Sequence, residues 1–560
     1  MTVEMRVDEV QFVHFNDVYH IPSATLLARF LNLQREFAAS NPASQTLTLF
    51  SGDAFSPSLE ASVLKGAQVC PLLNLVGVDI GCYGNHDFDF GDARLIELSN
   101  QLKFPWLLSN VFHPPRDQRR TLGSAREYIV RNLENGLKVG FIGLAGTDWP
   151  SNCELLPPCE FEPPVQAARR LARHLRVEER CDLVVALTHM RVPEDMAVAN
   201  ATVSGDSRID LLLGGHDHDV LRRFAGDTDF TAENVEQGRK VTEVEVDGRI
   251  PDAEGGIRLV KSGTDWRGLS LVRLIARRDE NGAVVASTVK LRQYTDIQVA
   301  VATPQPPTHV VEILQGIHDQ VGKLVQRPLL HAATPIDGRN AMIRSQETNM
   351  GNMLADAVRA FYDTDIGLFN SGAVRSDRIL GATELDGEPL LVRDIINICP
   401  FGNSILVKKL PGSIVRLALE NSVSDMHTDG RFLQVSGLRV VASWHRPEWS
   451  RVVDVFLQRP DGGLEPLDPD RTYTVAMPSF IARGYDGFSW FARLETLIGE
   501  EAAITEVGLL LAIFGHEESS DGDMHAIGIE RARAVTIVGQ NPSDSLPIVK
   551  PVVEDRIRFV

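Results

Sequence analysis

Ligands suited to hard or borderline divalent metals occur in clusters through the first half of the chain. They are carboxylates, imidazoles and one side-chain amide, and no thiolate pattern accompanies them. Two such cations held about 3.5–4 Å apart can clamp a phosphate, lower the pKa of a bound water and stabilise in-line displacement. Asp53 could bridge the two cations because a carboxylate has two oxygens. The candidate metal ligands are Asp17, His20, Asp53, Asn85, His189, His216 and His218.

The stretch Gly84-Asn85-His86-Asp87-Phe88-Asp89 adds candidates for proton transfer. His86 directly follows the amide ligand and could stabilise or protonate a leaving oxygen. Asp89 lies three residues further on and could hold the His86 imidazole in the required tautomer. We therefore predict His86 and Asp89 as a catalytic pair.

Each ligand cluster follows a short apolar run, at residues 11–13, 47–50, 78–80, 183–187 and 209–213. Such runs, bounded by glycine or charge, are typical of buried strands in a parallel or mixed sheet. The carboxyl ends of strands in an open α/β sheet share one rim, so we expect the clusters to converge there. A single histidine or aspartate at such a position is more often structural. Five independent strand ends with ligand-type residues favour a site.

Helices are predicted between these strands, at residues 21–38 and 164–177, so the first half alternates strands and helices. A proline-rich stretch at 303–308 ends this region, and apolar spacing predicts a linker helix over 310–325. The second half mixes helices at 350–362 and 412–424 with strands at 405–410, 452–457 and 473–476. We predict an α/β protein with domains at 8–300 and 326–540, a linker at 301–325 and a tail at 541–560.

Composition bounds the class of protein. The 560 residues are 43% hydrophobic and 23% charged, as expected for a globular protein of two to four domains. A net charge of -19 argues against binding a nucleic-acid polymer, which needs a basic face. No apolar run approaches about 18 residues, and no signal peptide is visible. Sparse cysteines in apolar surroundings indicate a cytoplasmic protein, although Cys153 and Cys159 could pair. The oligomeric state is left open.

Several stretches of the second half could bind a nucleotide. Phe401 and Phe480 lie in or beside turn-like segments, and an aromatic face stacks on a base for about 1–3 kcal/mol. Arginines such as Arg375 can hold a phosphate in a bidentate fork, and a carboxylate such as Asp486 can accept both ribose hydroxyls. The alternative is that both phenylalanines belong to the core.

The ordered motifs of the first half resemble those of the calcineurin-like metallophosphoesterases. That resemblance implies that one metal is bound by Asp17, Asp53 and His218, and the other by Asp53, Asn85, His189 and His216. It also implies that His86 and Asp89 form the catalytic dyad. The first motif departs from the family pattern Asp-x-His, because this chain has Asp17-Val18-Tyr19-His20. Either His20 reaches the metal from a bulged loop, or the first site lacks that ligand.

The second half is similar to the C-terminal domain of the 5'-nucleotidase family, which includes ecto-5'-nucleotidases and periplasmic UDP-sugar hydrolases. The similarity is carried by Arg344 with residues 347–353, and by residues 370–375, 400–402 and 484–487. It implies that Phe401 and Phe480 stack on the base, Asn370 contacts the base, and Asp486 binds the ribose. Arg344 and Arg375 would face the phosphate. In that family the second domain swings on the linker helix.

The resemblance implies a metallophosphoesterase β-sandwich flanked by helices, then a linker helix and a second α/β nucleotide-binding domain. It also implies a hydrolase that uses two divalent ions (Zn, Mn, Co or Fe) and a metal-bound hydroxide on nucleotide phosphoesters, above all nucleoside 5'-monophosphates. Alternatives are UDP-sugars, nucleoside polyphosphates, dinucleotides, cyclic nucleotides and, in one branch, a protein-bound thiosulfonate. A catalytically weak nucleotide-binding sensor is the non-enzyme alternative.

Overall fold

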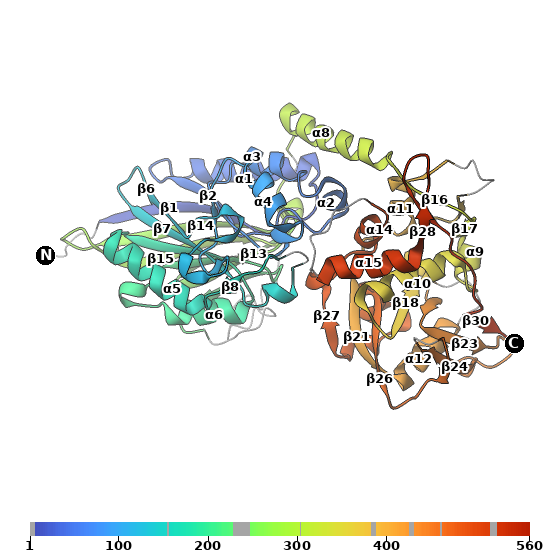
Figure 1. Cartoon of the computed structure of the whole chain (residues 1–560). Coiled ribbons are helices and arrows are strands. Elements are labelled where there is room, and N and C mark those ends of the chain that lie inside the picture. Colours follow the sequence, from blue (N-terminus) through green and yellow to red (C-terminus); the bar gives the residue numbers. More distant parts are fainter. Residues whose placement is uncertain are drawn as a thin grey trace. The chain divides into compact units, whose positions relative to one another are not determined.

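The computed structural model describes residues 6–153, 156–227, 247–302, 304–381, 388–424, 430–459, 462–515 and 524–560 (Figure 1). The chain divides into two compact units, residues 1–319 and 320–560. The division falls within α8 (Thr308–Val325), the helix expected at 310–325.

Two sheets form the centre of unit 1. In the first sheet, β1, β2, β3 and β4 are parallel neighbours, and β14 continues it antiparallel to β1. Its order is β12 (Arg249–Gly255), β15 (Val284–Tyr294), β14 (Leu269–Arg278), β1 (Val7–Phe15), β2 (Thr46–Phe50), β3 (Ile80–Cys82) and β4 (Trp106–Leu107). In the second sheet, β7, β9, β10 and β13 are parallel neighbours. Its order is β11 (Val220–Phe224), β13 (Ile257–Ser262), β10 (Leu211–Gly215), β9 (Leu183–His189), β7 (Lys138–Ala145) and β6 (Tyr128–Asn132).

The two sheets pack face to face as a β-sandwich. Strand β1 shows why, because its side chains alternate between two apolar environments. Phe12 faces the other sheet, where its ring meets Phe141 of β7 at 6.2 Å, and both belong to the inter-sheet core. Phe15 faces outward and packs its ring against Phe30 of α1 (Ala24–Ala39). Burial on both faces explains the continuous apolar runs of these strands.

Helices cover both outer faces of the sandwich (Figure 1). On the first sheet lie α1 and α3 (Cys70–Val76), with α2 (Leu59–Leu64), α4 (Gly91–Ser99) and α7 (Ile297–Ala300) in the same region of unit 1. On the second sheet lie α5 (Pro164–Arg173) and α6 (Val192–Ala201). A two-stranded ribbon joins β5 (Val111–Phe112) to β8 (Glu160–Phe161). The expected helices at 21–38 and 164–177 are present.

The five strands expected to share one sheet are therefore distributed over two. Strands β1, β2 and β3 belong to the first sheet, while β9 and β10 belong to the second. Apolar runs cannot separate these arrangements, because strands in the middle of a sandwich and strands of an open doubly wound sheet are both buried on two faces. The helix-flanked β-sandwich that the family resemblance implied is confirmed.

Unit 2 is built around a five-stranded sheet. Its order is β22 (Leu433–Ser436), β18 (Ile366–Asn370), β26 (Thr472–Pro478), β21 (Ile405–Pro411) and β27 (Thr496–Ile498). One face packs on α10 (Asn349–Tyr362), α11 (Val392–Ile398), α14 (Glu506–Phe514) and α15 (Met524–Thr536). The other face packs on α12 (Gly412–Ser422) and α13 (Ser479–Ala482). Helix α9 (Asn340–Ile343) and the ribbon β17 (Ile336–Asp337)–β19 (Ile379–Leu380) complete this region.

The last twenty residues, which the sequence analysis predicted to be a tail, form strands that pair with other strands of unit 2. Strand β29 (Pro547–Val549) joins β16 (Pro328–Ala332) in parallel and β28 (Ile537–Gln540) antiparallel. Strand β30 (Ile557–Phe559) joins β23 (Leu438–Ala442), which pairs in turn with β24 (Val452–Gln458) and β25 (Leu464–Pro466). Strand β20 (Leu390–Leu391) completes the sheet that contains β16. These pairings make the C-terminal residues part of unit 2.

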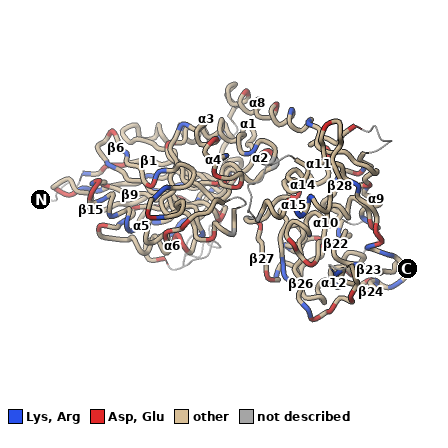
Figure 2. The backbone as a smooth tube through the Cα atoms, in the orientation of Figure 1, with Lys and Arg blue, Asp and Glu red and all other residues tan. Residues whose placement is uncertain are grey.

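Charged residues of both signs are interspersed along each unit (Figure 2). Among the described residues, no helix combines the length and apolarity needed to cross a membrane. The same residues contain no disulfide bond, and four of the six cysteines, Cys70, Cys82, Cys181 and Cys399, are buried.

Candidate metal centre and its surroundings

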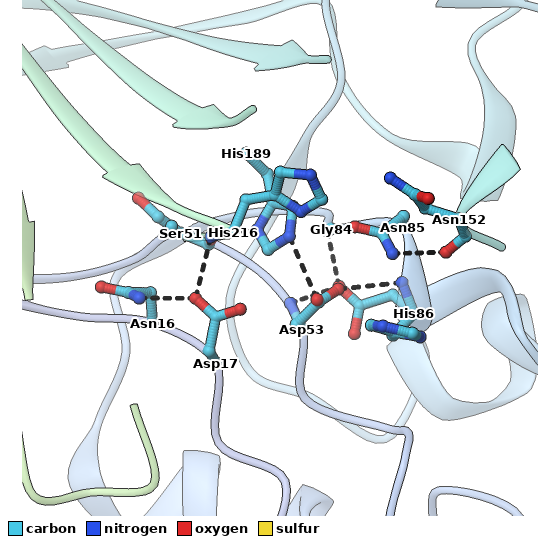
Figure 3. A network of polar contacts seen from close by, with 12 residues as sticks. Asn16, Asp17, Ser51, Asp53, Gly84, Asn85, His86, Asn152, His189 and His216 are labelled. Atoms are coloured by element: carbon cyan, nitrogen blue, oxygen red, sulfur yellow. Dashed lines mark hydrogen bonds and ion pairs between the residues drawn. The ribbon is translucent and has the colours of Figure 1, made fainter. Parts of the chain in front are cut away.

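The ligand clusters meet in unit 1 where the loops after β1, β2, β3, β9 and β10 come together (Figure 3). Ser51, at the end of β2, connects the two sheets. Its carbonyl accepts a hydrogen bond from His189 Nδ1 at 2.7 Å, and its hydroxyl donates to the Leu213 carbonyl at 2.7 Å. Because a carbonyl can only accept, the His189 proton is on Nδ1, and Nε2 faces Asp53 at 3.1 Å. The predicted convergence is present, although the strands come from two sheets.

The backbone is unusual at four candidate ligands. Asp17, Asp53, His216 and His218 have φ values of 54°, 61°, 80° and 62°, in the left-handed region that side-chain-bearing residues rarely adopt. Such conformations cost of order 1–3 kcal/mol each and persist where the surroundings hold them. Their concentration at one place is typical of a functional site.

Two glycines make room for the side chains of the cluster. A Cβ atom on Gly84 would overlap the Asp53 carboxylate. A Cβ atom on Gly215 would lie 2.6 Å from the Ser51 carbonyl oxygen and 2.8 Å from Asp17 Oδ2. The close approach of these loops therefore requires glycine at both positions.

One group of ligands is ready to bind a cation. Donor atoms of Asp53, His189 and His216 lie within 4.8 Å of one another, and all three residues are buried. The Asn85 Nδ2 group donates to the Asn152 carbonyl at 2.5 Å, while the buried Asn85 Oδ1 accepts no hydrogen bond from any residue that the structure describes. An unsatisfied buried oxygen costs about 1–3 kcal/mol unless something binds it. The donor set suits a hard or borderline divalent metal.

Electrostatics support this assignment. Burial lowers the pKa of His189, but the Asp53 and Asp17 carboxylates outweigh burial and raise it to about 9. Burial raises the pKa of the Asp17 and Asp53 carboxyls, but neighbouring imidazoles, His189 foremost, hold both below their usual value. The cluster is thus a concentration of buried negative charge that favours a bound cation.

The first motif is arranged differently from the sequence expectation. The Tyr19 hydroxyl, not the His20 ring, lies at Asp17 Oδ1 (2.9 Å), Asp53 Oδ2 (3.0 Å) and His218 Nε2 (2.8 Å). The His20 side chain is 66% exposed, and its Nδ1 lies 3.1 Å from Asp265 Oδ1. Asp17-Val18-Tyr19 therefore aligns with Asp-x-His, and the structure does not bring His20 into the cluster. Burial and the two carboxylates raise the pKa of Tyr19.

The predicted catalytic pair is in contact. His86 begins a short 3₁₀ turn (His86–Phe88), which places Asp89 on the same side of the chain. His86 Nδ1 and Asp89 Oδ2 are 2.7 Å apart, and both side chains are buried. The His86 backbone N–H donates to Asp53 Oδ1 at 2.9 Å, which ties the pair to the metal ligands. Asp89 therefore orients the His86 ring.

Three further residues support the site, and the sequence analysis gave none of them a role. Asp87 accepts backbone hydrogen bonds from Asp53, Ala54 and Gly84, and burial raises its pKa to about 7. Asp148 lies 3.0 Å from His216 Nε2; burial would raise its pKa, but His216 and Arg191 hold it at about 2. Nothing in the spacing of Asp148 marks it, because it lies far from every motif.

Lys261 of β13 is the third. Its buried ammonium donates to the carbonyls of Met190 and Gly215, each at 2.7 Å, and pairs with Asp195 (2.8 Å) and Asp217. Met190 follows His189, and Asp217 lies between His216 and His218. Lys261 therefore holds the loop that carries His189 and the loop that carries His216 and His218. The sequence signal that could have indicated this role is a lysine within an otherwise apolar predicted strand, because lysine is seldom buried without a partner.

The candidate substrate residues lie in unit 2. Phe401 is 56% exposed, and the Arg375 guanidinium lies 4.9 Å from its ring centroid. Phe480 is half-buried and stacks on Tyr485 at 5.0 Å, so Tyr485 joins the predicted aromatic set. Exposure of Phe401 argues against the alternative that it belongs to the core.

The polar members of this set differ in environment. Asn370 is buried at the end of β18, and none of the described residues donates a hydrogen bond to its Oδ1. Arg344 ends the short helix α9, and its buried Nε has no acceptor within the described part of the chain. Asp486 has φ 53°, and its carbonyl accepts from Asn421 Nδ2 at 2.9 Å. Unsatisfied buried polar atoms of this kind are typical of ligand-binding positions.

A helix-flanked β-sandwich with buried carboxylate, imidazole and amide ligands at one end defines the class of metallophosphoesterases. Comparison agrees: residues 10–220 match the calcineurin-like phosphoesterase model, and residues 325–493 match the 5'-nucleotidase C-terminal domain model. The chain belongs to the 5'-nucleotidase family, which includes metal-dependent nucleotide phosphoesterases.

Individual relatives are distant. The trifunctional nucleotide phosphoesterase protein YfkN of Bacillus subtilis is 24% identical over 87% of this chain, which spans only 32% of that protein. The 5'-nucleotidase of Mus musculus is 26% identical over 82% of this chain and 78% of its own length. The NAD nucleotidase of Haemophilus influenzae has the same fold, with a TM-score of 0.65, 16% identity and 99% coverage of both chains.

Proposed function

We propose that this protein hydrolyses nucleoside 5'-monophosphates to nucleoside and phosphate. The observation that carries the proposal is the contact, in unit 1, between the candidate metal ligands and the His86–Asp89 pair. The buried donors of Asp53, His189 and His216 lie close together, and the His86–Asp89 pair is bonded to Asp53 through the His86 backbone. A cation position and a candidate proton donor are thus adjacent.

The residues that would hold one divalent cation are Asp53, Asn85, His189 and His216, and Asp17, Asp53 and His218 would contribute to a second. Bound there, such cations lower the pKa of water and offset charge on phosphoryl oxygens. Other residues of the chain orient the ligands. His189 Nδ1–H bonded to Ser51 fixes the orientation of that ring, and Asp148 does the same for His216.

In this proposal His86 assists the leaving oxygen. Asp89 accepts from His86 Nδ1, so the other ring nitrogen can present a proton to the ester oxygen as the bond to phosphorus breaks. A nucleoside alkoxide is a poor leaving group, and protonation removes that difficulty. Positioned acid–base groups typically contribute 10²–10⁴-fold to a rate.

For the nucleoside, the supporting observations are in unit 2. Phe401, Phe480 and Tyr485 offer aromatic faces, Asn370 offers an unsatisfied amide oxygen, and Asp486 offers a carboxylate. We assign Arg344 and Arg375 to the phosphate. We also propose that residues 8–300 and 326–540 are the two functional domains, with 301–325 as the linker between them.

The test is steady-state phosphate release from a nucleotide panel, with chelated protein re-supplied with Mn²⁺, Co²⁺, Zn²⁺ or Mg²⁺. We expect a nucleoside 5'-monophosphate to be the best substrate and His86→Ala to lose about 10²–10⁴-fold in kcat. His113→Ala, at a partly exposed histidine paired with Asp92, is the matched control. Binding without turnover under every metal would refute the proposal in favour of a nucleotide-binding sensor. Faster cleavage of a UDP-sugar, polyphosphate, dinucleotide or cyclic nucleotide would refute the 5'-monophosphate as the preferred substrate and identify another.

We also propose a cytoplasmic location. Its support is the burial of Cys70, Cys82, Cys181 and Cys399, whose thiols are inaccessible. Fractionation of cells that express the protein at its natural level, followed by immunodetection, tests this. Recovery outside the cytoplasm would refute it.

A further inference from the structure

Tyr19 stands where the family's first motif has a histidine, and it lies among ligands. Tyr19 is 7% exposed, and its hydroxyl contacts Asp17, Asp53 and His218 at 2.8–3.0 Å. We propose that Tyr19 is itself a metal ligand, and that its phenolate oxygen makes the first position selective for a hard, highly charged cation such as ferric iron. The inference rests on the dinuclear centre of the proposed function and concerns which cation that centre selects.

Proton counting is the first argument. A phenol has one proton, yet the Tyr19 oxygen lies within hydrogen-bonding distance of two carboxylate oxygens, at 2.9 and 3.0 Å. Only one of these contacts can be a hydrogen bond donated by Tyr19, so the other brings two oxygens together without a proton. The single Tyr19 proton thus cannot serve the Asp17 and Asp53 contacts at once. A cation at this place would be coordinated by the oxygens of Tyr19, Asp17 and Asp53.

The spacing of the donors is the second argument. Four donor atoms, from Tyr19, Asp17, Asp53 and His218, are separated by 2.8, 2.9, 3.0 and 3.3 Å where pairs are in contact. A tetrahedral site with bonds of about 2.0 Å needs ligands about 3.3 Å apart. Movements of a few tenths of an ångström therefore suffice to admit a cation. A tyrosine that only packs in the core would not place its hydroxyl among two carboxylates and an imidazole.

The loop holds Tyr19 in place independently of any cation. The Val18 N–H donates to the Asp53 carbonyl at 2.8 Å, and the Tyr19 N–H donates to Asp265 Oδ1 at 3.1 Å. The Tyr19 ring meets the His86 and His218 rings edge-on, at 6.0 and 5.3 Å. These contacts position the hydroxyl before a metal arrives, which lowers the cost of assembling the site.

The chemistry of the donor set indicates the cation. With Tyr19 as phenolate, the first position has three anionic oxygen donors and one imidazole, whereas a histidine would leave two anionic oxygens. Anionic oxygen donors favour hard, highly charged ions over soft ones. On binding, the metal–oxygen bond replaces the O–H bond and the proton goes to solvent. Iron supplied as Fe³⁺ needs no oxidant or reductant.

The experiment measures metal content and colour without substrate. Chelated protein is loaded with Zn²⁺ or with Fe³⁺ supplied as its citrate complex, desalted, and analysed for metal per chain and for visible absorption. We expect the iron-loaded protein to show a phenolate-to-iron charge-transfer band. Tyr19→Phe should lose that band and about one Zn²⁺ per chain, while Tyr19→His should keep the zinc content without the band. His20→Ala, at an exposed side chain, should match the unmodified protein in both readouts.

Several results would overturn the inference. They are an iron-loaded protein without the band, a band that persists in Tyr19→Phe, and loss of metal in His20→Ala. A zinc content that rises in Tyr19→Phe would mean that the hydroxyl closes the position. Thermal unfolding of each variant shows whether it is folded, and Tyr19→Phe removes a single oxygen atom. Coloured protein that hydrolyses no nucleotide would refute the proposed function alone.

Discussion

Replacing Glu506 by glutamine tests how the loop that carries Phe401 is held. Glu506 begins α14 with its side chain buried, and both its oxygens lie 3.2 Å from Asn403 Nδ2. Its backbone N–H donates to the Asn403 carbonyl at 2.9 Å. Asn403 is two residues from Phe401, so this anchor controls the aromatic candidate for base stacking. Burial raises the pKa of Glu506 from 4.5 to about 8, against the lowering effect of the Asn403 hydrogen bonds.

The direction of the pH effect follows from that pKa. Below about pH 4.5 the carboxyl is protonated in both the folded and the unfolded chain. Between 4.5 and 8 the unfolded chain has lost the proton while the folded chain keeps it, so stability falls as pH rises. Each pH unit is worth about 1.4 kcal/mol. From pH 5.5 to 8.5 the loss is about 3 kcal/mol, or roughly 10 °C in Tm for a domain of this size.

Calorimetric unfolding of the unmodified protein and of Glu506→Gln across this pH range measures the effect. Groups remote from Glu506 titrate equally in both proteins. The buried Cys399 thiol, whose pKa is raised by burial and by Glu506, stays protonated over this pH range, so the difference in stability isolates Glu506. We expect the unmodified protein to lose stability relative to the variant as pH rises. Glu495→Gln, at an exposed carboxylate paired with Lys409, is the control and should follow the unmodified protein. Parallel pH profiles for the unmodified protein and Glu506→Gln would refute the reasoning.

Two more substitutions probe the site in each unit. Lys261→Met removes the buried ammonium partner of Asp195 and Asp217 and should cost about 3–5 kcal/mol in denaturant unfolding, whereas Lys290→Met, which breaks an exposed pair with Glu254, should cost less than about 1 kcal/mol. Equal losses would contradict the anchoring role of Lys261. Phe480→Ala removes a stacking face worth about 1–3 kcal/mol and should raise KM for a nucleotide about 5- to 150-fold with metal content unchanged. An unchanged KM would indicate a substrate without a base.

Much of the fold was accessible from the sequence because local patterns dominated it. The helices near Leu26 and Met353 have apolar residues three or four apart, and the structure has helices there. The grouping of strands into sheets was not accessible. A strand such as β9 is apolar on both faces in an open sheet and in a sandwich alike, so its pattern carries no information about its neighbours. The final strands β29 and β30 are three residues each, too short for a periodicity.

The same distinction applies to the site. Asp53, His189 and His216 follow apolar runs, and their donor atoms lie within 4.8 Å of one another. Lys261 and Asp148 act through partners more than forty residues away, and such pairings leave no trace in spacing. Only the folded chain reveals which distant residues orient the ligands. Sequence reasoning therefore finds groups that could bind a cation more readily than groups that hold them.

The first motif shows where identity and position diverge. A search for histidine after Asp17 selects His20, because imidazole is the familiar ligand, and it then requires an inserted residue. The backbone instead keeps the usual spacing: Val18 N–H bonds to Asp53, and residue 19 is the one directed at Asp17 and His218. Direction at a strand end is set by the number of residues, not by their type, so one extra residue would turn the side chain away. Residue 19 thus lies where the family pattern has its histidine, with a phenol in place of an imidazole.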